Sequence, residues 1–347
     1  MLTVYSDSHL HRQAKTELYG GRLVPPHECP ERAGFVLGQI KASGLGEVIA
    51  PRPFGMEPIR RVHEAGYLEF LANAWDEWSR TGYQGEAIPT CWPARRMAQR
   101  RPTHIDGKLG YYAASSETSI SAGSWEAALG AVDVALTAAA HVRAGARGAF
   151  ALCRPPGHHA ASDLYCGYCF LNNAAIAAQW LRDQGAARVA ILDVDFHHGN
   201  GTQDIFYDRD DVFFASLHGD PQEAFPHFLG YADEEGTGRG LGFNANYPLP
   251  RGAGFDAWGA ALRSALGRIA TYAPDYIVVS LGVDTFENDP ISFFKLNSAD
   301  FSRYGTMIGE LGIPTLFVLE GGYAVAEIGV NVVNVLSAYD SATGHGR

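Results

Sequence analysis

The sequence predicts an α/β protein with a single-domain fold, in which a central, mostly parallel sheet is flanked by helices. From about residue 124 onward, short runs rich in β-branched residues alternate with longer Ala-rich amphipathic segments, which is typical of βαβ units. The short runs are apolar at almost every position, as expected of parallel strands buried on both faces. No composition break, internal repeat or low-complexity linker divides the 347 residues. We therefore expect one domain over residues 1–347.

The second part of the chain supplies most of the expected elements. We expect a helix over residues 124–143 with Ser124 as its N-cap, followed by a strand over 148–153. A helix over 173–184 ends before Gly185 and leads to a strand over 188–195. Further strands are expected over 212–217, 276–281 and 315–319, with helices over 255–270 and 299–311.

The first hundred residues are less regular. A strand near residues 3–5 and helices near 30–43 and 67–80 are expected. Residues 83–105 are rich in Pro, Arg and Thr and show no period. A loop of this length within a compact domain is usually functional or interfacial.

Composition excludes several classes of partner. The chain has 27 Lys and Arg against 38 Asp and Glu, a net charge of −11, so nucleic acid and anionic membranes are disfavoured and small cations are favoured. No apolar run approaches the ~20 residues of a spanning helix, and the N-terminus resembles no secretion signal. The five cysteines are odd in number and scattered, which indicates no disulfide framework and fits a reducing cytoplasm.

One cysteine pair has the spacing of a redox motif. Cys166 and Cys169 form a C-x-x-C sequence, but a catalytic redox pair should lie at a helix N-terminus just after a strand. A structural zinc site would need a second such pair, and none exists in the sequence. Ordinary buried thiols are therefore the favoured interpretation.

Polar residues follow four of the expected strands, in residues 154–159, 193–201, 282–284 and 320–323. Ligands of open α/β sheets bind outside the carboxyl ends of the strands. The period-two alternation of a strand places Asp193, Asp195 and His197 on one face. We expect these four segments to meet in one site.

Converging carboxylates and imidazoles are unfavourable unless a cation holds them. Asp195, His197 and Asp284 would supply three N/O ligands, and three protein ligands with an open position are typical of catalytic zinc. Phe286 stands where a second bridging carboxylate would be needed, so one metal is expected. The alternative is that the two aspartates only cap helices and that the histidines are surface or core residues.

The remaining polar residues of these segments fit acid/base chemistry. His158 and His159 are candidates because imidazole titrates near neutral pH. Tyr323 follows two glycines and could donate a hydrogen bond to a developing oxyanion. Asp193 could orient one histidine and Asn200 the other.

Taken together, these segments resemble the histone deacetylase superfamily of zinc-dependent amide hydrolases, which has the arginase-deacetylase α/β fold. The matching motifs are residues 154–160, 167–173, 193–203, 280–284 and 320–323. Within the superfamily, residues 14–21, 83–105, 218–228 and 286–290 resemble bacterial amidohydrolases of acetylated polyamines.

The resemblance implies a role for each site residue. Zinc would be held by Asp195, His197 and Asp284; His159, with His158 beside it, would be general base and acid; and Tyr323 would polarise the acetyl carbonyl. Tyr168 and Phe225 would flank a narrow tunnel, and Glu17, Asp106 and Glu117 would lie near its mouth, where carboxylates pair with distal ammonium groups. The alternative for these three acids is solvated surface charge.

The resemblance also implies structural cations and a dimer. Potassium would be bound at one site by Asp193, Asp195, His197, Ser216 and Leu217, and at a second site near Phe206, Arg209, Val212 and Phe243. Related enzymes dimerise through the insertion loop, so residues 83–105 are the expected homodimer interface.

The expected activity is release of acetate from N-acetylated polyamines such as acetylputrescine, acetylcadaverine and acetylspermidine. Acetyl-lysine in proteins or peptides is the nearest rival substrate. A metal-bearing binding module without turnover is a further alternative, but such a module has no use for both His159 and Tyr323. Some superfamily members carry Asp where Asn200 stands, and a neutral partner leaves His159 easier to deprotonate. The preferred polyamine, and whether zinc or iron(II) is bound, stay open.

Overall fold

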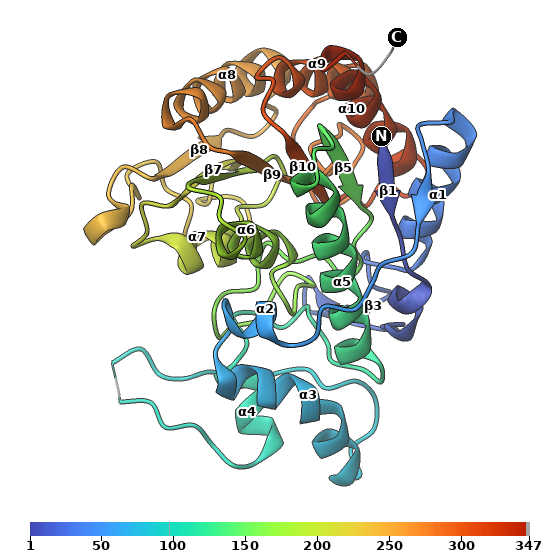
Figure 1. Ribbon diagram of the computed structural model, residues 1–347. Coiled ribbons are helices and arrows are strands. Elements are labelled where there is room, and N and C mark those ends of the chain that lie inside the picture. Colours follow the sequence, from blue (N-terminus) through green and yellow to red (C-terminus); the bar gives the residue numbers. More distant parts are fainter. Residues whose placement is uncertain (97, 345–347) are drawn as a thin grey trace.

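A parallel sheet forms the centre of the computed structural model, which describes residues 1–96 and 98–344 (Figure 1). The strands of this sheet are β1 (Leu2–Val4), β4 (Val48–Ile49), β5 (Gly148–Ala151), β6 (Val189–Asp193), β7 (Val212–Gly219), β8 (Asn244–Leu249), β9 (Tyr276–Leu281) and β10 (Thr315–Leu319). In the described residues their order is β4-β1-β5-β10-β9-β6-β7-β8, and every neighbouring pair is parallel.

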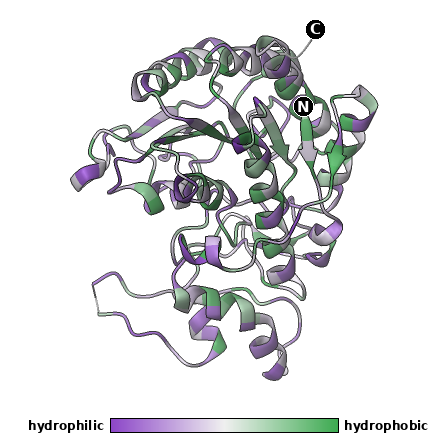
Figure 2. Cartoon of the chain, in the orientation of Figure 1, coloured by the Kyte–Doolittle hydropathy of each residue, from purple (hydrophilic) through white to green (hydrophobic). Residues whose placement is uncertain are grey.

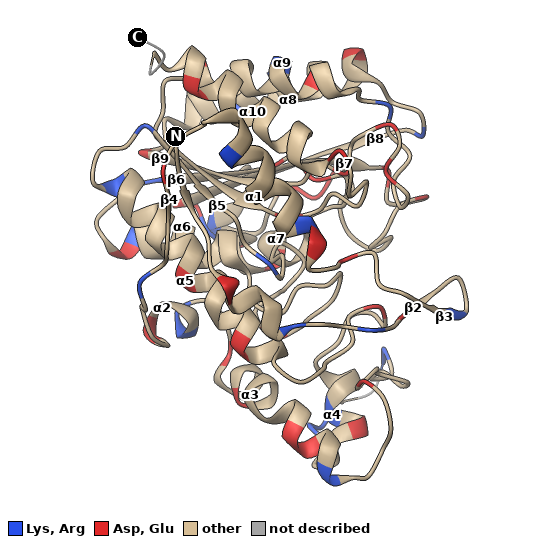
Figure 3. Cartoon of the chain, turned by 90° about the vertical axis from the view of Figure 1, so that its right-hand side faces the viewer, with Lys and Arg blue, Asp and Glu red and all other residues tan. Residues whose placement is uncertain are grey.

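Helices cover both faces of this sheet (Figure 1). The α-helices are α1 (Glu31–Ser43), α2 (Glu57–Arg60), α3 (Ala65–Arg80), α4 (Ile105–Tyr111), α5 (Ser124–Arg143), α6 (Asn173–Asp183), α7 (Asn200–Phe206), α8 (Phe255–Tyr272), α9 (Ser298–Gly309) and α10 (Ile328–Ala342). Helices α5 and α6 pack on one face, and α1, α8, α9 and α10 pack on the other. The short elements are η1 (Asp7–His11), η2 (Gly238–Gly240) and the antiparallel hairpin β2 (Glu17–Tyr19)–β3 (Arg22–Val24), which projects from the body of the molecule in Figure 3.

The alternation of side chains along each strand explains these two layers. In β6, Val189 and Ile191 join the core beneath α5 and α6, whereas Ala190 and Leu192 join the core beneath α8 and α9. Successive strand residues point to opposite faces, so a strand between two helical layers must be apolar at every position. The apolar colour of the central strands in Figure 2 and the few charges on them in Figure 3 agree with this. The predicted fold class is confirmed.

The strand order brings the polar strand ends together. Strand β9 lies between β10 and β6, with Ser280 beside Asp193 and Leu281 beside Leu319. Strand β5 lies on the other side of β10. Since parallel strands end at the same edge of a sheet, the segments that follow these four strands meet there.

Most expected boundaries agree with the structure to within a few residues, and α5 spans the expected 124–143. The predicted N-cap was wrong: Gly123, with φ of 77°, is the N-cap, and Ser124 is the first residue of the helix. The Ser124 hydroxyl instead accepts hydrogen bonds from the Ser121 amide and the Arg12 guanidinium. A buried arginine therefore takes the oxygen that would otherwise cap the helix.

Several elements were not expected from the sequence, notably β8, α7 and α10. Helix α10 has the sequence IGVNVVNVLSAYDSA, in which Val and Asn have low intrinsic helix propensity. It packs against α9 and α1, and burial of its valines stabilises it where propensity does not.

The described residues of the expected insertion loop before α4, 83–96 and 98–104, extend beyond α3 and α4 and are largely hydrophilic in Figure 2. These described residues form no helix or strand, apart from a bridge between Ala87 and Ile120. Helix α4 begins at Ile105, where the expected loop ends. Within the described chain, no helix has the length and apolar character needed to span a bilayer.

Candidate active site

Three potential metal ligands converge at the carboxyl edge of the sheet. Asp195 and His197 follow β6, and Asp284 follows β9. Nδ1 of His197 lies 3.2 Å from Asp195 Oδ1 and 3.0 Å from Asp284 Oδ2. All three side chains are buried, and their ligand atoms lie within 4.8 Å of one another.

Backbone groups hold the two carboxylates in place. The Gly321 amide donates to Asp195 Oδ2 at 2.7 Å, and the Phe196 amide donates to Asp284 Oδ1 at 2.7 Å. A Cβ atom at Gly282 would lie 2.0 Å from Asp195 Oδ2, and one at Gly321 would lie 2.4 Å from Asp284 Oδ2. The motif glycines therefore let neighbouring strand ends approach these carboxylates closely.

The electrostatics of this group fit a divalent cation. Burial raises the pKa of Asp284, and the adjacent Asp195 carboxylate raises it further. Burial alone would lower the pKa of His197, but Asp195 and Asp284 outweigh it and raise that pKa to about 10. The site therefore attracts positive charge. Two carboxylates and one imidazole with an open side are the donor set of a catalytic zinc site.

Two histidines lie beside this group, and each is oriented by a different partner. Nδ1 of His158 lies 2.9 Å from Asp193 Oδ2, and Nδ1 of His159 donates to the Asn200 carbonyl oxygen at 2.7 Å. Both Nδ1 atoms are engaged, so each histidine has Nε2 left for chemistry. The ring centroids of the two histidines are 4.0 Å apart.

The two histidines differ in electrostatic environment. Burial lowers the pKa of His158, but the carboxylates of Asp193 and Asp195 outweigh this effect and raise it to about 10. Burial lowers the pKa of His159 well below its usual value, and the positive charge on His158 and His197 lowers it further. The pKa values of these two adjacent imidazoles are thus shifted in opposite directions.

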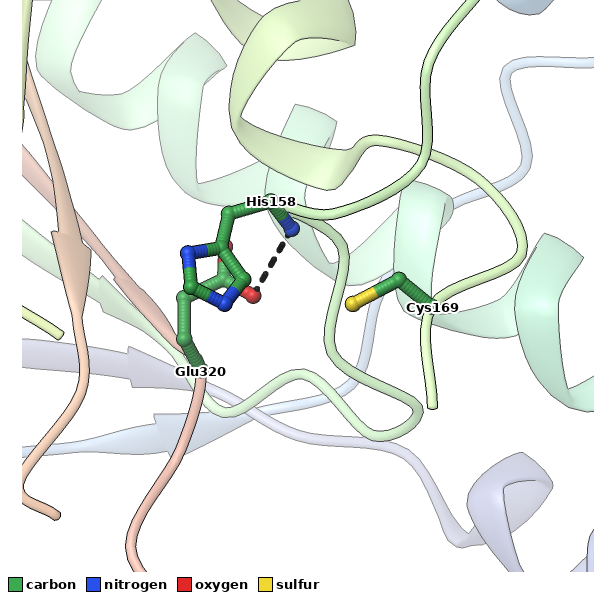
Figure 4. Close-up of side chains that lie close together, drawn as sticks. All are labelled: His158, Cys169 and Glu320. Carbon is green, nitrogen blue, oxygen red and sulfur yellow. Dashed lines mark hydrogen bonds between the residues drawn. The ribbon is translucent and has the colours of Figure 1, made fainter. Parts of the chain in front are cut away.

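A second group of potential ligands, whose side chains lie close together in Figure 4, consists of His158, Cys169 and Glu320. Glu320 Oε2 accepts hydrogen bonds from the amides of Gly157, at 2.6 Å, and His158, at 3.2 Å. The Cys169 thiol donates to the Gly167 carbonyl, and burial raises its pKa well above the usual range. A neutral thiol is a poor ligand, so this group fixes the backbone that carries the histidines.

Tyr323 lies on the turn after β10 and is held from several sides. The Arg32 guanidinium donates to the carbonyls of Gly322 and Glu320, and it lies 4.8 Å from the centre of the Tyr323 ring. The amide of Tyr323 donates to Asp289 Oδ2 at 2.7 Å. The turn passes through Gly322, whose φ of 127° excludes most other residues.

A cavity of about 360 Å³ leads to this site and is lined by His159, His197, Tyr323, Tyr168, Phe225 and Glu117, among others. The Phe225 ring is nearly perpendicular to that of His159, with ring centroids 5.1 Å apart. Tyr168 has φ of 68°, and its amide donates to Thr118 Oγ1 at 2.7 Å. Aromatic side chains therefore form part of the cavity wall next to the site.

The three acidic residues expected at the mouth have different surroundings. Glu117 lines the cavity, and its buried Oε2 has no hydrogen-bond partner in the described part of the chain. Glu17 is fully buried, and its carboxylate accepts from the His27 amide at 3.2 Å. Asp106 lies on α4, accepts from the Tyr83 hydroxyl at 3.0 Å and does not line the cavity of this chain.

Several wall residues were not identified as site residues from the sequence. Phe196, Ile291, Phe293, Glu223 and His227 line the cavity. Within residues 218–228 the sequence predicts only Phe225 as a wall residue, and within 286–290 it predicts none. Side-chain direction in such loops depends on long-range contacts, and no local pattern indicates it.

The residues expected at the monovalent-cation sites fall into two places. Asp193 pairs in register with Ser216, and Leu217 is the next residue of β7. The Ser216 hydroxyl lies 2.7 Å from His218 Nδ1. The second set surrounds the end of α7, where the Phe206 carbonyl accepts from the Arg209 amide and the Phe243 carbonyl accepts from the Phe214 amide. Val212 begins β7 beside them.

Comparison with known proteins identifies close relatives. Residues 26–339 match the family model described as histone deacetylase domain. The chain is 59% identical over 336 residues to the acetylpolyamine amidohydrolase of Mycoplana ramosa, covering 97% of this chain and 98% of that protein. It is 58% identical over 344 residues to acetylpolyamine amidohydrolase 1 of Pseudomonas aeruginosa, covering 99% of each. The crystal structure of an acetylpolyamine aminohydrolase from Burkholderia pseudomallei matches with a TM-score of 0.94, at 39% identity and with 99% of each chain covered. These similarities confirm the resemblance and the fold that the motifs predict.

Proposed function

This chain belongs to the histone deacetylase family, and we propose that it is a metal-dependent amidohydrolase that releases acetate from N-acetylated polyamines. The observation that carries the proposal is a cavity that joins the potential metal ligands to a buried acidic group. His197 lines it beside its two aspartates, and so does Glu117, whose buried Oε2 has no hydrogen-bond partner among the described residues. Such a cavity suits a slim substrate with an acetamide at one end and an ammonium group further along.

Zinc is the proposed metal, held by Asp195, His197 and Asp284. When bound, it would polarise the acetyl carbonyl and activate a water molecule. The remaining chemistry is assigned to the chain's own side chains.

His159 is the proposed general base and acid, with His158 beside it. Burial lowers the pKa of His159 and leaves Nε2 unprotonated, so that it can take a proton from water, and the hydrogen bond to Asn200 offsets this lowering only in part. The same proton then goes to the leaving nitrogen, so that the amide and water yield acetate and a free amine. Tyr323 is the proposed donor to the oxyanion that forms as water adds.

Substrate recognition is assigned to the cavity walls and mouth. Tyr168 and Phe225 would contact the alkyl chain, and Glu117 would pair with the distal ammonium group, supported by the negative charge of Glu17. Asp106 could take part only across an interface between two copies, because it does not line the cavity of its own chain.

We also propose a homodimer formed through residues 83–105. Tyr83 and Trp92 of this loop have exposed fractions of 46% and 44%, and exposed aromatic residues favour an interface.

Potassium is proposed at both cation sites described above. A cytoplasmic location is proposed because all five cysteines are free. The net charge of −11 supports small cationic amines over nucleic acid or anionic membranes as partners.

The test is acetate release from acetylputrescine, acetylcadaverine, acetylspermidine and an acetyl-lysine peptide, measured side by side before and after chelation. We expect turnover of the acetylpolyamines that is lost on chelation and restored by zinc. Faster turnover of the peptide would make the protein an acetyl-lysine deacetylase. Metal binding without any turnover would leave only a binding module.

A further inference from the structure

We propose that Asp289 is a positioning residue for Tyr323. This inference rests on the proposed hydrolase function and adds a residue to its machinery. Asp289 does not line the cavity, so it would act through the residues that it holds.

The Asp289 carboxylate accepts three backbone hydrogen bonds from two separate segments. Oδ2 accepts from the amides of Tyr323, at 2.7 Å, and Ala324, at 3.2 Å. Oδ1 accepts from the amide of Ile291 at 3.1 Å. Only 7% of Asp289 is exposed, so water cannot replace it as the acceptor for these amides.

The segment that Asp289 holds has little rigidity of its own. Tyr323 follows Gly321 and Gly322 and precedes α10, and glycine restricts the backbone least of all residues. Arg32 fixes the carbonyls of Glu320 and Gly322, whereas Asp289 fixes the amides of Tyr323 and Ala324. The positively charged Arg32 therefore holds the carbonyls of this turn, and the carboxylate of Asp289 holds its amides.

This arrangement determines where the phenol lies. A hydroxyl can stabilise an oxyanion only within hydrogen-bond distance of it, and a displacement of about 1 Å can cost 10²-fold in rate. Loss of the Asp289 contacts would release the Tyr323 backbone at the residue that carries the phenol. We infer that Asp289 affects kcat through Tyr323.

A double-mutant cycle tests this inference. Asp289→Asn is nearly isosteric, but its amide cannot accept hydrogen bonds on both sides. We expect Asp289→Asn to lower kcat about 10- to 100-fold in zinc-loaded enzyme, with KM changed less than about 3-fold. In the Tyr323→Phe background the same substitution should lower kcat less than about 3-fold, since no hydroxyl is left to misplace.

Two outcomes would contradict the inference. A normal kcat in Asp289→Asn would show that the contacts are dispensable. An equal loss in both backgrounds would show that Asp289 acts elsewhere, for example through the cavity wall at Ile291. If Asp289→Asn does not fold by circular dichroism, Asp289→Ser, which keeps a small acceptor, replaces it in the same cycle.

A matched control separates this effect from general loss of a carboxylate. Asp275 also accepts hydrogen bonds from two consecutive backbone amides, those of Ala187 at 2.6 Å and Arg188 at 3.0 Å. It lies at the amino ends of β6 and β9, opposite to the end that carries the site. Asp275→Asn should leave kcat within about 2-fold of the wild type. An inactive wild type would overturn the proposed function, whereas an active wild type with a normal Asp289→Asn would overturn only this inference.

Discussion

The hydroxyl of Tyr323 is the single group that best separates hydrolysis from metal binding. We expect Tyr323→Phe to lower kcat about 10²- to 10³-fold, because the donor is stronger in the transition state than in the ground state. The ring stays in place over Arg32, so zinc content, thermal stability and KM should change little. A near-normal kcat would remove the oxyanion role, and loss of zinc would indicate a structural role instead.

Glu117 is the residue that we propose pairs with the distal ammonium group, because it lines the cavity. We expect Glu117→Gln to lower kcat/KM for acetylspermidine by about 10-fold, since a charge-assisted hydrogen bond is worth about 1.5–3 kcal/mol. An acetylated monoamine of equal chain length should lose less than about 2-fold. Steady-state kinetics on both substrates is the measurement.

The cavity offers a matched control for that prediction. Glu223 also lines it, but Arg251 already pairs with this carboxylate at 2.8 Å, so Glu223→Gln should affect the two substrates more nearly equally. Equal losses in Glu117→Gln on both substrates would assign Glu117 a structural role.

Among single residues, the sequence predicts those whose polar side chains stand next to a buried apolar strand. Asp195 and Asp284 follow apolar strands, where a carboxylate needs a partner, and this alone indicates a site. Phe293 and Ile291 also line the cavity, but apolar residues in a loop have the same pattern whether they face a cavity or a core. The role of Asp289 depends on contacts across 34 and 35 residues of sequence, which no local pattern shows.

The three proposed metal ligands come from the ends of two strands, Asp195 and His197 after β6 and Asp284 after β9. We expect Asp195→Ala or Asp284→Ala to lose both zinc and activity, because the two remaining ligands hold the metal far less tightly than three. Elemental analysis of dialysed protein is the measurement. Asp183→Ala removes an ion pair with Arg61 and a hydrogen bond from Gln179 at a site away from the three ligands; it is the control and should retain both. Stoichiometric zinc in either ligand variant would contradict the assignment.

Whether a helix or strand can be predicted from the sequence depends on what stabilises it. Strands β9 and β10 are predicted to the residue, because burial on both faces requires continuous apolar runs bounded by polar residues. Helix α10 is not predicted, because its stability comes from α9 and α1. Helix α7 is also unpredicted, since its seven residues begin within the motif at Asn200 and lack a period of their own.

For the whole molecule, the buried ion network connects the N-terminal segment to the site. Glu28 pairs with Arg154 at 2.6 Å and with Arg32 at 3.3 Å. Arg154 begins the segment that carries the two histidines, and Arg32 holds the turn of Tyr323. Glu28 therefore links two strand ends of the site through one carboxylate, and buried pairs of this kind are costly to break.

Buried neutral histidines should make the stability of the whole fold depend on pH. Burial lowers the pKa of His63 to about 4, and its Nε2 accepts a hydrogen bond from the amide of Asn172, the N-cap of α6. The unfolded chain binds this proton near pH 6.5. Between pH 6.5 and 4 the unfolded state therefore holds more protons, so the free energy of unfolding falls as the pH falls.

The size of this effect follows from the same pKa. A difference of about 2.5 pH units corresponds to about 3 kcal/mol, all of it lost by pH 4. His63→Gln keeps a carbonyl oxygen to accept from Asn172 but cannot titrate, so its urea unfolding midpoint should fall less between pH 7.5 and 5 than that of the wild type. The other buried histidines are common to both proteins and cancel in the comparison. Parallel pH dependence in the two proteins would show that burial does not lower the pKa of His63 in the folded state.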